Sequence, residues 1–376
     1  MKIALVFDDL IQLGGAERLL SAIHEVYPDA PIYTSHASKK WEIRCAALSI
    51  RLITSFMQRL PFRIPLNRLY GLLGIHALAF ETFDFREFDV VLSISSRFAH
   101  GIVVEPPCTH ICYMNSPGRM FWDSRSYFET ERFLGTSAGG KMCNLCLAPF
   151  LCFLRIWDYS AAQRVDHFLA NSLVPQSRIK KYYRRDSKII HPFVPNVDPA
   201  VYGTWSEGVY FLVITRLVPW KRVDVAVEAC EKLSLKLKVI GTGPDLARLR
   251  KNSNGSTEFL GYVTDEEKYR QILGCKALLV TQLEDFGIAV LEAMLFGKPV
   301  VAYGSGGVLE TVVPGVTGEF FYDQHAESLA NVLAGFDPLR YSREDCKNQA
   351  LKFSKEAFKN ELDDFVKKVY HGKDCL

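Results

Sequence analysis

Two carboxylates eight positions apart, Glu284 and Glu292, flank a corner of the chain where a strand is expected to turn into a helix. Residues 277–281 form an apolar run of only strand length, which predicts a buried strand of a parallel sheet. Residues 288–296 have the composition of a buried helix. Glu284 is therefore expected in the loop and Glu292 inside the helix, off the carboxyl end of one strand, where parallel sheets bind their ligands.

The loop between the two carboxylates can bind an anion through its backbone. The N–H groups near Phe286, Gly287, Ile288 and Ala289 are expected to be the unpaired donors of a helix N-terminus, at the positive end of the helix dipole. They can receive a diphosphate without help from a basic side chain. Gly287 leaves room for a ligand to touch the backbone.

Two more loops carry residues that suit phosphate chemistry. Arg216 and Lys221 stand five positions apart before a predicted helix, where a guanidinium and an ammonium can neutralise charge that builds on a leaving diphosphate. The alternative is that both are surface charges. Gly241 and Gly243 form a tight turn that can approach a ligand, although such turns end many strands. With the glutamate pair, these loops predict a phosphate-binding site.

Strands and helices alternate around this corner, which predicts a doubly wound parallel sheet. The loops after its strands should then carry the chemistry. The predicted strands are residues 210–214, 237–240, 258–261, 277–281 and 299–302, and the predicted helices are residues 223–233, 244–251, 265–273, 288–296 and 326–334.

These residues resemble the retaining family 4 glycosyltransferases, which have the GT-B fold: two Rossmann-like, doubly wound α/β domains that face each other across a cleft. The most specific matches are the Glu284–Glu292 corner and the pair of Arg216 and Lys221. Residues 14–18 also belong to the most specific matches. The less specific matches, which resemble the polysaccharide and O-antigen-type mannosyltransferases of the family, are residues 121–123, 157–158, 164–166 and 170–172.

The resemblance implies a role for each matching residue. Arg216 and Lys221 would hold the diphosphate, and Glu284 would grip the donor sugar. Glu292 would bind the ribose hydroxyls. The residues expected around the donor, from the resemblance and from the loops after the strands, are Gly14, Gly15, Gly241, Gly243, Tyr262, Val263, Phe286, Gly287, Ile288, Ala289 and Glu292.

The N-terminal half has a strand-and-helix pattern of its own, with strands at residues 2–7, 89–95 and 109–114 and an amphipathic helix at residues 16–26. In the family, the residue after the last of these strands is frequently a His that faces the reacting sugar. Asn115 stands there instead.

An asparagine changes what this position can do. Asn115 can hydrogen-bond a hydroxyl, but it cannot carry a proton near neutral pH. His100 is the alternative candidate for the missing histidine, against the simpler interpretation of a structural residue. Because the resemblance implies that the acceptor gives its proton to the departing diphosphate, Asn115 is compatible with transfer.

The composition fits two ordinary domains. The chain has 376 residues, 48% of them hydrophobic, enough for two cores, and its net charge of +3 does not suggest a nucleic-acid partner. Residues 51–80 contain arginines but no acid, and are otherwise rich in Leu, Ile and Phe. This segment fits an anionic membrane surface and fits equally a pair of core-facing helices with solvated arginines.

No secretory leader and no membrane-spanning segment are expected, so the chain is predicted to be cytoplasmic, with any membrane contact peripheral and at the inner face. Its ten cysteines are then expected as reduced thiols. The alternative is a zinc site of Cys108, Cys112, Cys143 and Cys146, although the family needs no such metal.

Three prolines between residues 189 and 199 predict a linker. The predicted domains are residues 1–195, an acceptor-side Rossmann-like domain, and residues 200–352, the nucleotide-sugar domain. The resemblance implies that a final helix, at about residues 353–376, crosses back onto the first domain.

The expected reaction moves a hexose from a nucleoside diphosphate sugar to a hydroxyl, with retention at the anomeric carbon. No metal is expected, and the chain has no Asp-x-Asp triplet. The mannosyltransferase resemblance favours GDP-mannose as donor, with a glycan or lipid-linked glycan as acceptor, and a UDP-hexose is the alternative donor. A nucleotide-sugar epimerase is a second alternative. A third is a non-catalytic partner of another transferase, which Asn115 and Thr215 favour because related enzymes often have Gly at the latter position.

Overall fold

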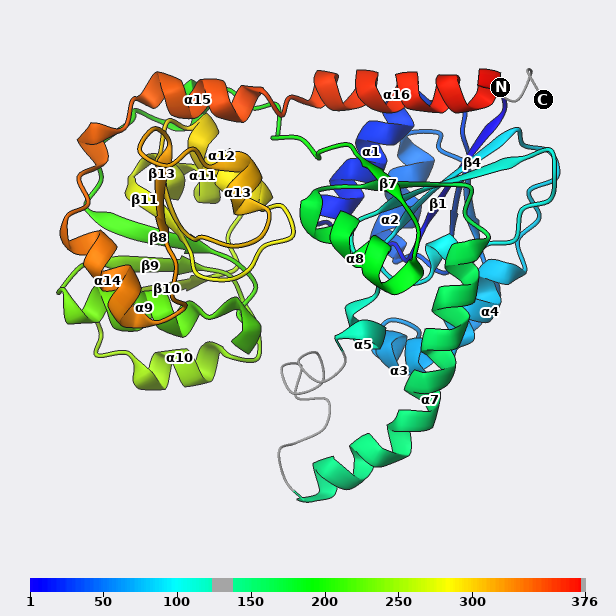
Figure 1. Ribbon diagram of the computed structural model, residues 1–376, viewed down its shortest axis with the longest axis horizontal. Coiled ribbons are helices and arrows are strands. Elements are labelled where there is room, and N and C mark those ends of the chain that lie inside the picture. The colour runs from blue at the N-terminus through cyan, green and yellow to red at the C-terminus, as the bar shows by residue number, and fades with distance from the viewer. Residues whose placement is uncertain (124–137, 373–376) are drawn as a thin grey trace. The chain divides into compact units, whose positions relative to one another are not determined.

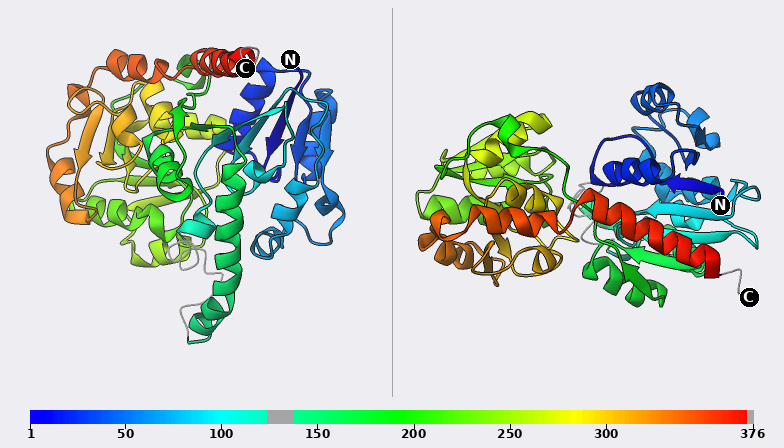
Figure 2. Two further views of the ribbon diagram at one scale, coloured as in Figure 1. Left: turned by 45° about the vertical axis from the view of Figure 1, so that its right-hand side comes forward. Right: turned by 90° about the horizontal axis from the view of Figure 1, so that it is seen from above.

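The computed structural model describes residues 1–123 and 138–372 (Figure 1). They divide into two compact units: residues 1–123, 138–191 and 358–372 belong to the first, and Pro192–Ala357 form the second. Each unit has one sheet, and every pairing between its strands is parallel (Figures 1 and 2). The predicted class of two doubly wound α/β sheets is therefore confirmed.

The sheet of the first unit has seven strands in the order β3-β2-β1-β4-β5-β6-β7. Because the strand order reverses between β1 and β4, the loops after these two strands diverge at a switch point. The strands are β1 Ile3–Phe7, β2 Ile32–Thr34, β3 Leu52–Thr54, β4 Val90–Ser95, β5 Thr109–Met114, β6 His167–Ala170 and β7 Ser187–Ile189. The helices are α1 Gly15–Val26, α2 Lys39–Ala47, α3 Asn67–Leu72, α4 Ile75–Glu81, α5 Arg119–Trp122, α7 Ala138–Gln163, α8 Leu173–Tyr183 and α16 Lys355–Gly372.

The sheet of the second unit has six strands in the order β10-β9-β8-β11-β12-β13, with its switch point between β8 and β11. The strands are β8 Tyr210–Ile214, β9 Leu237–Ile240, β10 Thr257–Gly261, β11 Cys275–Val280, β12 Val300–Tyr303 and β13 Gly318–Phe321. The helices are α9 Val223–Lys232, α10 Leu246–Asn252, α11 Asp265–Leu273, α12 Ile288–Leu295, α13 Val308–Thr311, α14 Ala326–Ala334 and α15 Arg343–Leu351.

Both faces of the second sheet are buried. Along β8, Tyr210 and Leu212 belong to one hydrophobic cluster, and Phe211 and Val213 belong to another. Successive side chains of a strand point to opposite faces, so each cluster packs helices onto one face. This double burial explains why the strands are apolar throughout rather than alternating.

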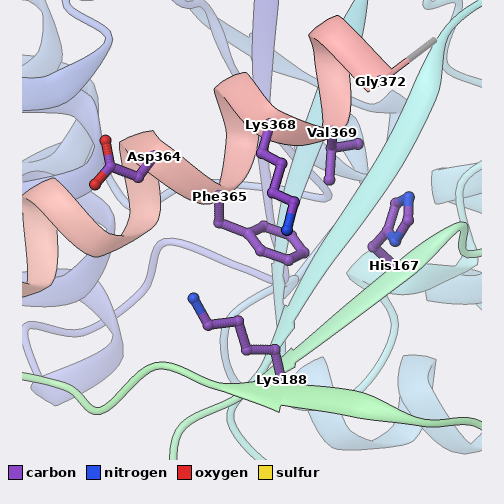
Figure 3. Close-up of a pocket in the computed structure, with 7 residues that line it drawn as sticks. All are labelled: His167, Lys188, Asp364, Phe365, Lys368, Val369 and Gly372. Atoms are coloured by element: carbon purple, nitrogen blue, oxygen red, sulfur yellow. The ribbon is translucent and has the colours of Figure 1, made fainter. Parts of the chain in front are cut away.

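The final helix, α16, packs on the first unit. Phe358 lies edge-on to Tyr113 of β5, with ring centroids 6.1 Å apart, and Lys188 of β7 pairs with Glu361 at 3.1 Å. A cavity of about 650 Å³ separates α16 from the start of β6 (Figure 3). The cavity lies at the amino end of β6. Ligands of such sheets bind at the opposite edge, at the carboxyl ends of the strands. Its lining residues are His167, Lys188, Asp364, Phe365, Lys368, Val369 and Gly372.

Residues 51–80 form β3, a 3-10 turn at Phe56–Arg59, and the two short helices α3 and α4. Leu72 and Phe80 face the core, whereas Leu69, Leu73 and Leu78 are exposed. The interpretation as core-facing helices is therefore correct for one face of this segment, and its other face is apolar and open.

Across residues 1–123 and 138–372, no helix is both long and apolar enough to cross a bilayer. In the same described residues, no three side chains of His, Cys, Asp or Glu are grouped so that they could hold a metal ion. Cys108 and Cys112 form no disulfide bond among the described residues. Cys143 and Cys146, named above for the alternative zinc site, lie among residues whose side chains are not described.

The predicted domains, residues 1–195 and 200–352 with a final helix at about residues 353–376 that crosses back onto the first domain, remain a proposal. In the structure the last residue of the first unit before the second is His191, and the return to the first unit is at Phe358, inside α16.

Candidate active site

The loops that leave β8 and β11 meet at the switch point of the second sheet. Lys221, in the loop after β8, places its Nζ 2.8 Å from Oε1 of Glu284, in the loop after β11. Both side chains are mostly buried. The structure thus brings together two predicted site residues from adjacent strands, at the edge where a parallel sheet binds ligands.

Backbone contacts fix the position of Lys221. A 3-10 turn, Pro219–Lys221, ends the loop, and the Thr281 hydroxyl donates to the carbonyl oxygen of Lys221 at 3.1 Å. The ammonium also lies 4.4 Å from the centroid of the Trp220 ring, where a cation is attracted by the face of an indole. The lysine is therefore held from two sides, and the role of Trp220 was not predicted.

The glycine turn after β9 packs directly on the loop that carries Arg216. A Cβ added to Gly241, whose φ is +139°, would lie 1.8 Å from the Thr215 carbonyl oxygen, and one added to Gly243 would lie 2.0 Å from the Leu217 oxygen. The N–H of Leu217 also donates to the Thr242 oxygen at 2.9 Å. These glycines are thus required by backbone packing, which positions Arg216.

Glu284 is held by its side chain and by its backbone. The Gln282 amide donates to Oε1 of Glu284, and the N–H of Gly307 donates to the Glu284 carbonyl oxygen at 2.8 Å. Gly306 has no room for a Cβ, which would lie 2.4 Å from that same oxygen. The loop after β12 is therefore part of the site, and the sequence analysis missed it.

The helix after Glu284 begins as predicted. Gly287 is the N-cap of α12 with φ of +93°, a left-handed conformation that favours glycine. Ile288 and Ala289 are the first helical residues, so their N–H groups belong to the four that have no partner within the helix. This end of α12 can accept an anion.

Glu292 lies inside α12 and is 5% exposed. Its Oε1 is 2.7 Å from Nζ of Lys268, which also lies 3.1 Å from Asp265 on α11. A buried carboxylate is stabilised by such a partner. The sequence analysis treated the segment around Lys268 only as a helix, and its run of charged residues was the available signal.

The loops after β9 and β10 are joined by one hydrogen bond, from the Gly241 N–H to the Gly261 oxygen at 2.8 Å. Tyr262 follows Gly261 and is 84% exposed, and Val263 packs partly against the core. Both residues therefore lie at the carboxyl end of β10, as predicted, and Tyr262 is open to a ligand.

The predicted glycine loop of the first unit begins α1. Gly14 is the N-cap, and its N–H donates to Oε2 of Glu17 at 2.8 Å, while Gly15 is exposed. Burial raises the pKa of Glu17. A ligand that approaches this helix end meets Gly15 with an open backbone, whereas the Gly14 N–H already has an acceptor.

Asn115 follows β5 in the first unit. Its N–H donates to the Ser95 oxygen at 2.9 Å, its amide donates to the Ser96 hydroxyl at 3.3 Å, and its carbonyl oxygen accepts from Asn171 at 3.1 Å. The backbone of Asn115 is thus held by two hydrogen bonds, and its side chain by the one to Ser96, at the carboxyl edge of the first sheet.

His100 offers no substitute for the family's histidine. Its ring is fully buried, and its Nε2 lies 3.2 Å from the equally buried carboxylate of Asp158. Its Nδ1 lies 3.2 Å from the Ser95 hydroxyl. A side chain with no exposed surface cannot contact a substrate, so the structural interpretation of His100 is the correct one.

A buried polar cluster at the carboxyl edge of the first sheet was not predicted. Asp9, after β1, pairs with Arg97 and accepts from the Asn67 amide at 3.2 Å, and Asn67 bonds His76 at 2.8 Å. Burial lowers the pKa of His76 to about 3, so this ring is neutral. Burial alone would raise the pKa of Asp9, but the neighbouring cationic groups, of which Arg97 has the largest effect, and the hydrogen bond from Asn67 together lower it. The members of the cluster come from the loops after β1 and β4 and from α3 and α4. These segments are far apart in the sequence, so no local sequence pattern predicts the cluster.

Comparison with known proteins identifies the family. Residues 198–353 match the model described as Glycosyl transferases group 1. The second unit of the chain therefore carries a domain of this family. The family is known as family 4 and comprises retaining enzymes that use nucleotide sugars, as the sequence resemblance indicated.

Two curated relatives are mannosyltransferases. An alpha-1,3/1,6-mannosyltransferase of Dictyostelium discoideum is 36% identical over 117 residues, which cover 30% of this chain and 28% of that protein. The O-antigen chain mannosyltransferase C of Escherichia coli is 24% identical over 147 residues, 35% of this chain and 39% of that protein. The matches thus span about a third of the length of these relatives.

Solved structures of similar fold cover nearly the whole chain. Anabaena HepE in complex with UDP has a TM-score of 0.68 at 18% identity and covers 98% of this chain and 100% of its own. The sucrose-phosphate synthase of Thermosynechococcus elongatus has a TM-score of 0.69 at 15% identity, with 99% and 100% covered. The two sheets of this chain therefore have the GT-B fold, as predicted.

Proposed function

We propose that this chain transfers a hexose from a nucleoside diphosphate sugar to a hydroxyl of an acceptor, with retention at the anomeric carbon. The observation that carries the proposal is the meeting of Lys221 and Glu284 at the switch point of a sheet that matches the group 1 glycosyltransferases. A cation for the diphosphate and a carboxylate for the sugar then stand side by side.

In the proposed reaction the bond between the sugar's anomeric carbon and the diphosphate oxygen breaks, and the acceptor oxygen bonds to the same face of that carbon. Arg216 and Lys221 would meet the negative charge that develops on the diphosphate, with the N-terminus of α12 at Gly287. The acceptor's proton goes to the departing diphosphate. Asn115 would contribute a hydrogen bond and no proton transfer. No resident metal is part of this proposal.

For the donor we propose GDP-mannose. Support comes from the curated mannosyltransferases among the relatives. A UDP-hexose is the second candidate, since HepE has been solved with UDP-glucose. Tyr262 and Val263, after β10, are the residues proposed to lie near the base.

For the acceptor we propose a glycan, either free or linked to a lipid, reached by a cytoplasmic protein that works peripherally at the inner face of a membrane. The open apolar face of α3 and α4, with arginines and no acid between residues 51 and 80, supports a membrane partner.

Calorimetric titration of the purified protein with GDP, UDP and ADP tests the donor. Selective GDP binding at micromolar strength, roughly −8 kcal/mol, is expected, followed by tighter binding of GDP-mannose. Selective binding of UDP would replace GDP-mannose by a UDP-hexose as the proposed donor and leave the proposed reaction unchanged. Absence of binding to all three nucleotides would overturn the proposal that the chain is an enzyme. It would favour the alternative of a non-catalytic partner, which Asn115 and Thr215 suggest.

Two variants test the reaction itself. Glu284→Gln and Lys221→Ala should each abolish transfer of labelled hexose. Glu344→Gln and Lys236→Ala change an exposed residue of the same type in the same unit, and should transfer at the wild-type rate. Near-normal transfer in both site variants would contradict the proposal, and an isomerised sugar formed without acceptor would indicate an epimerase.

A further inference from the structure

An apolar surface of the first unit is open around the two helices α3 and α7 and the junction between α3 and α4. Its members are large hydrophobic side chains from the turn before α3, from α3 itself, from the α3–α4 junction and from α7. They are Phe62, Leu69, Leu73, Phe150, Phe153 and Ile156, and we refer to them as the α3–α7 surface.

Contacts between the elements make this surface continuous. Helix α3 packs against both α4 and α7, and the three lie together in Figure 1. A Cβ added to Gly74, next to Leu73, would lie 3.8 Å from the ring of Phe153. The turn that carries Phe62 is tied to α3 because the Tyr70 hydroxyl donates to the Pro61 oxygen at 2.7 Å.

The part contributed by α7 is a helical stripe. Phe150, Phe153 and Ile156 are three residues apart, which places them on one side of the helix, and Phe153 and Ile156 are 60% and 62% exposed. Leu151 and Leu154 of the same helix are buried against the core. Helix α7 is therefore apolar on both sides, and only one side is covered by its own unit.

The charged side chains within the segments that carry this surface are positive, and the neighbouring Glu81, at the end of α4, is paired with Arg164. No Asp or Glu occurs between residues 51 and 80 or between residues 138 and 157. Arg59 is exposed and Arg63 and Arg68 are partly exposed, all within or next to the turn and helix that carry Phe62 and Leu69. A protein partner or a second copy of this chain would need an acidic complement, whereas an anionic lipid surface supplies both negative charge and an apolar interior.

We propose that the α3–α7 surface docks this protein on an anionic membrane, with Phe62, Phe153 and Ile156 inserted among the acyl chains and the arginines at the phosphate groups. Aromatic and aliphatic side chains beside arginines are the composition of interfacial helices that lie on a bilayer without crossing it. The proposal rests on the proposed function only in that a lipid-linked acceptor would be reached there, because the surface itself lies outside the donor site.

Cosedimentation with lipid vesicles tests the docking without any transferase assay. Vesicles of phosphatidylcholine alone should bind weakly, and vesicles in which one third of the lipid is phosphatidylglycerol should bind the wild-type protein strongly and in a salt-dependent manner. Phe153→Glu and Ile156→Glu should each lower binding to the anionic vesicles at least tenfold, and Arg59→Glu should lower it several-fold.

Leu339→Glu is the matched control, since Leu339 is 61% exposed and lies in the second unit. It should bind vesicles as the wild type does. Thermal melting of every variant, followed by circular dichroism, verifies that the loss is not unfolding. Equal binding to both kinds of vesicle, or unchanged binding by Phe153→Glu and Ile156→Glu, would overturn the proposal. So would a dimer in gel filtration that Phe153→Glu converts to a monomer.

GDP and UDP titrations of the same samples keep the two proposals separate. Vesicle binding without nucleotide binding would count against the proposed function alone. Nucleotide binding without vesicle binding would count against the docking surface alone.

Discussion

The ammonium of Lys221 lies 2.8 Å from the carboxylate of Glu284, although 63 positions separate the two residues along the chain. In this state the cation proposed for the diphosphate is already neutralised by the carboxylate proposed for the sugar. A nucleotide that enters must therefore share the ammonium with Glu284. The pair gives the protein a defined resting arrangement that the donor would alter.

This competition leads to opposite effects in two variants. Glu284→Gln should bind GDP or UDP about threefold to tenfold more tightly than the wild type, because the diphosphate no longer has to displace a carboxylate from the mostly buried Lys221 ammonium. The same variant should lose at least two orders of magnitude in transfer rate, since the sugar loses its carboxylate. Calorimetry and a transfer assay measure the two quantities.

The contrast comes from Lys221→Ala, which should weaken binding of the same nucleotides by about tenfold to a hundredfold, as expected for a hydrogen bond to a charged group. If Glu284→Gln weakens nucleotide binding instead, the carboxylate does not compete for Lys221, and the assignment of the sugar side to Glu284 is wrong.

Gly243 offers a test of the loop that carries Arg216. In Gly243→Ala the new methyl group would lie 2.0 Å from the Leu217 carbonyl oxygen, so the backbone must move. Overpacking of this kind lowers the free energy of unfolding by about 1–3 kcal/mol, and displacement of Arg216 should weaken diphosphate binding at least tenfold. Thermal melting and nucleotide titration measure both effects.

Gly335→Ala is the control, because a Cβ there has nothing within 4 Å. It should melt and bind like the wild type. A Gly243→Ala variant that matches it in nucleotide affinity would show that the contact between the two loops does not position Arg216.

Much of the fold could be predicted because buried parallel strands are local features of the sequence. The strands Tyr210–Ile214, Leu237–Ile240 and Thr109–Met114 and the helix Asp265–Leu273 have the bounds that the sequence predicted. Apolar runs of strand length, separated by turn residues, determine these elements without reference to the rest of the chain.

The partners within the site could not be predicted in this way. Lys268 reaches Glu292 only because α11 and α12 cover the same face of the sheet. Gly307 reaches Glu284 only because β12 lies beside β11. Such contacts depend on strand order. The glutamate corner was recognisable because its chemistry is contained in nine consecutive residues.

The buried pair of Glu292 and Lys268 leads to a prediction about the ribose. Glu292→Gln should weaken GDP and UDP binding by about tenfold to a hundredfold, the loss expected when hydrogen bonds to a carboxylate are weakened. A nucleotide without the ribose 2′ and 3′ hydroxyls should bind the wild type and the variant equally, since it has nothing to donate to Glu292. Titration of both proteins with both ligands completes the comparison.

Glu266→Gln changes an exposed glutamate of α11 and should leave the affinities for GDP, UDP and the hydroxyl-free nucleotide unchanged. If Glu292→Gln weakens the hydroxyl-free nucleotide as much as the natural one, Glu292 acts through the packing of α12 and not through the ribose.

Lys298 gives the second unit a dependence on alkaline pH. Its side chain is fully buried, with its ammonium 4.3 Å from the centroid of the Trp205 ring, and burial lowers its pKa from 10.5 to about 8. Below the lower value the lysine is protonated in both the folded and the unfolded chain. Between pH 8 and 10.5 the folded site has released its proton and the unfolded chain keeps it, so the free energy of unfolding rises with pH by up to about 1.4 kcal/mol per unit.

The measurement compares the melting temperatures of wild type and Lys298→Met across this window. Buried thiols such as Cys230, whose pKa is raised to about 12, oppose the rise in both proteins. The difference between the two proteins therefore reports on the lysine together with the neighbouring Cys275 thiol, whose pKa the Lys298 charge lowers. The wild type should gain about 3 kcal/mol relative to Lys298→Met between the two pKa values. Lys236→Met, at an exposed lysine, should follow the wild type. Parallel curves for wild type and Lys298→Met would mean that the buried lysine keeps its proton, stabilised by the Trp205 ring and by its hydrogen bond to the Ser206 carbonyl oxygen.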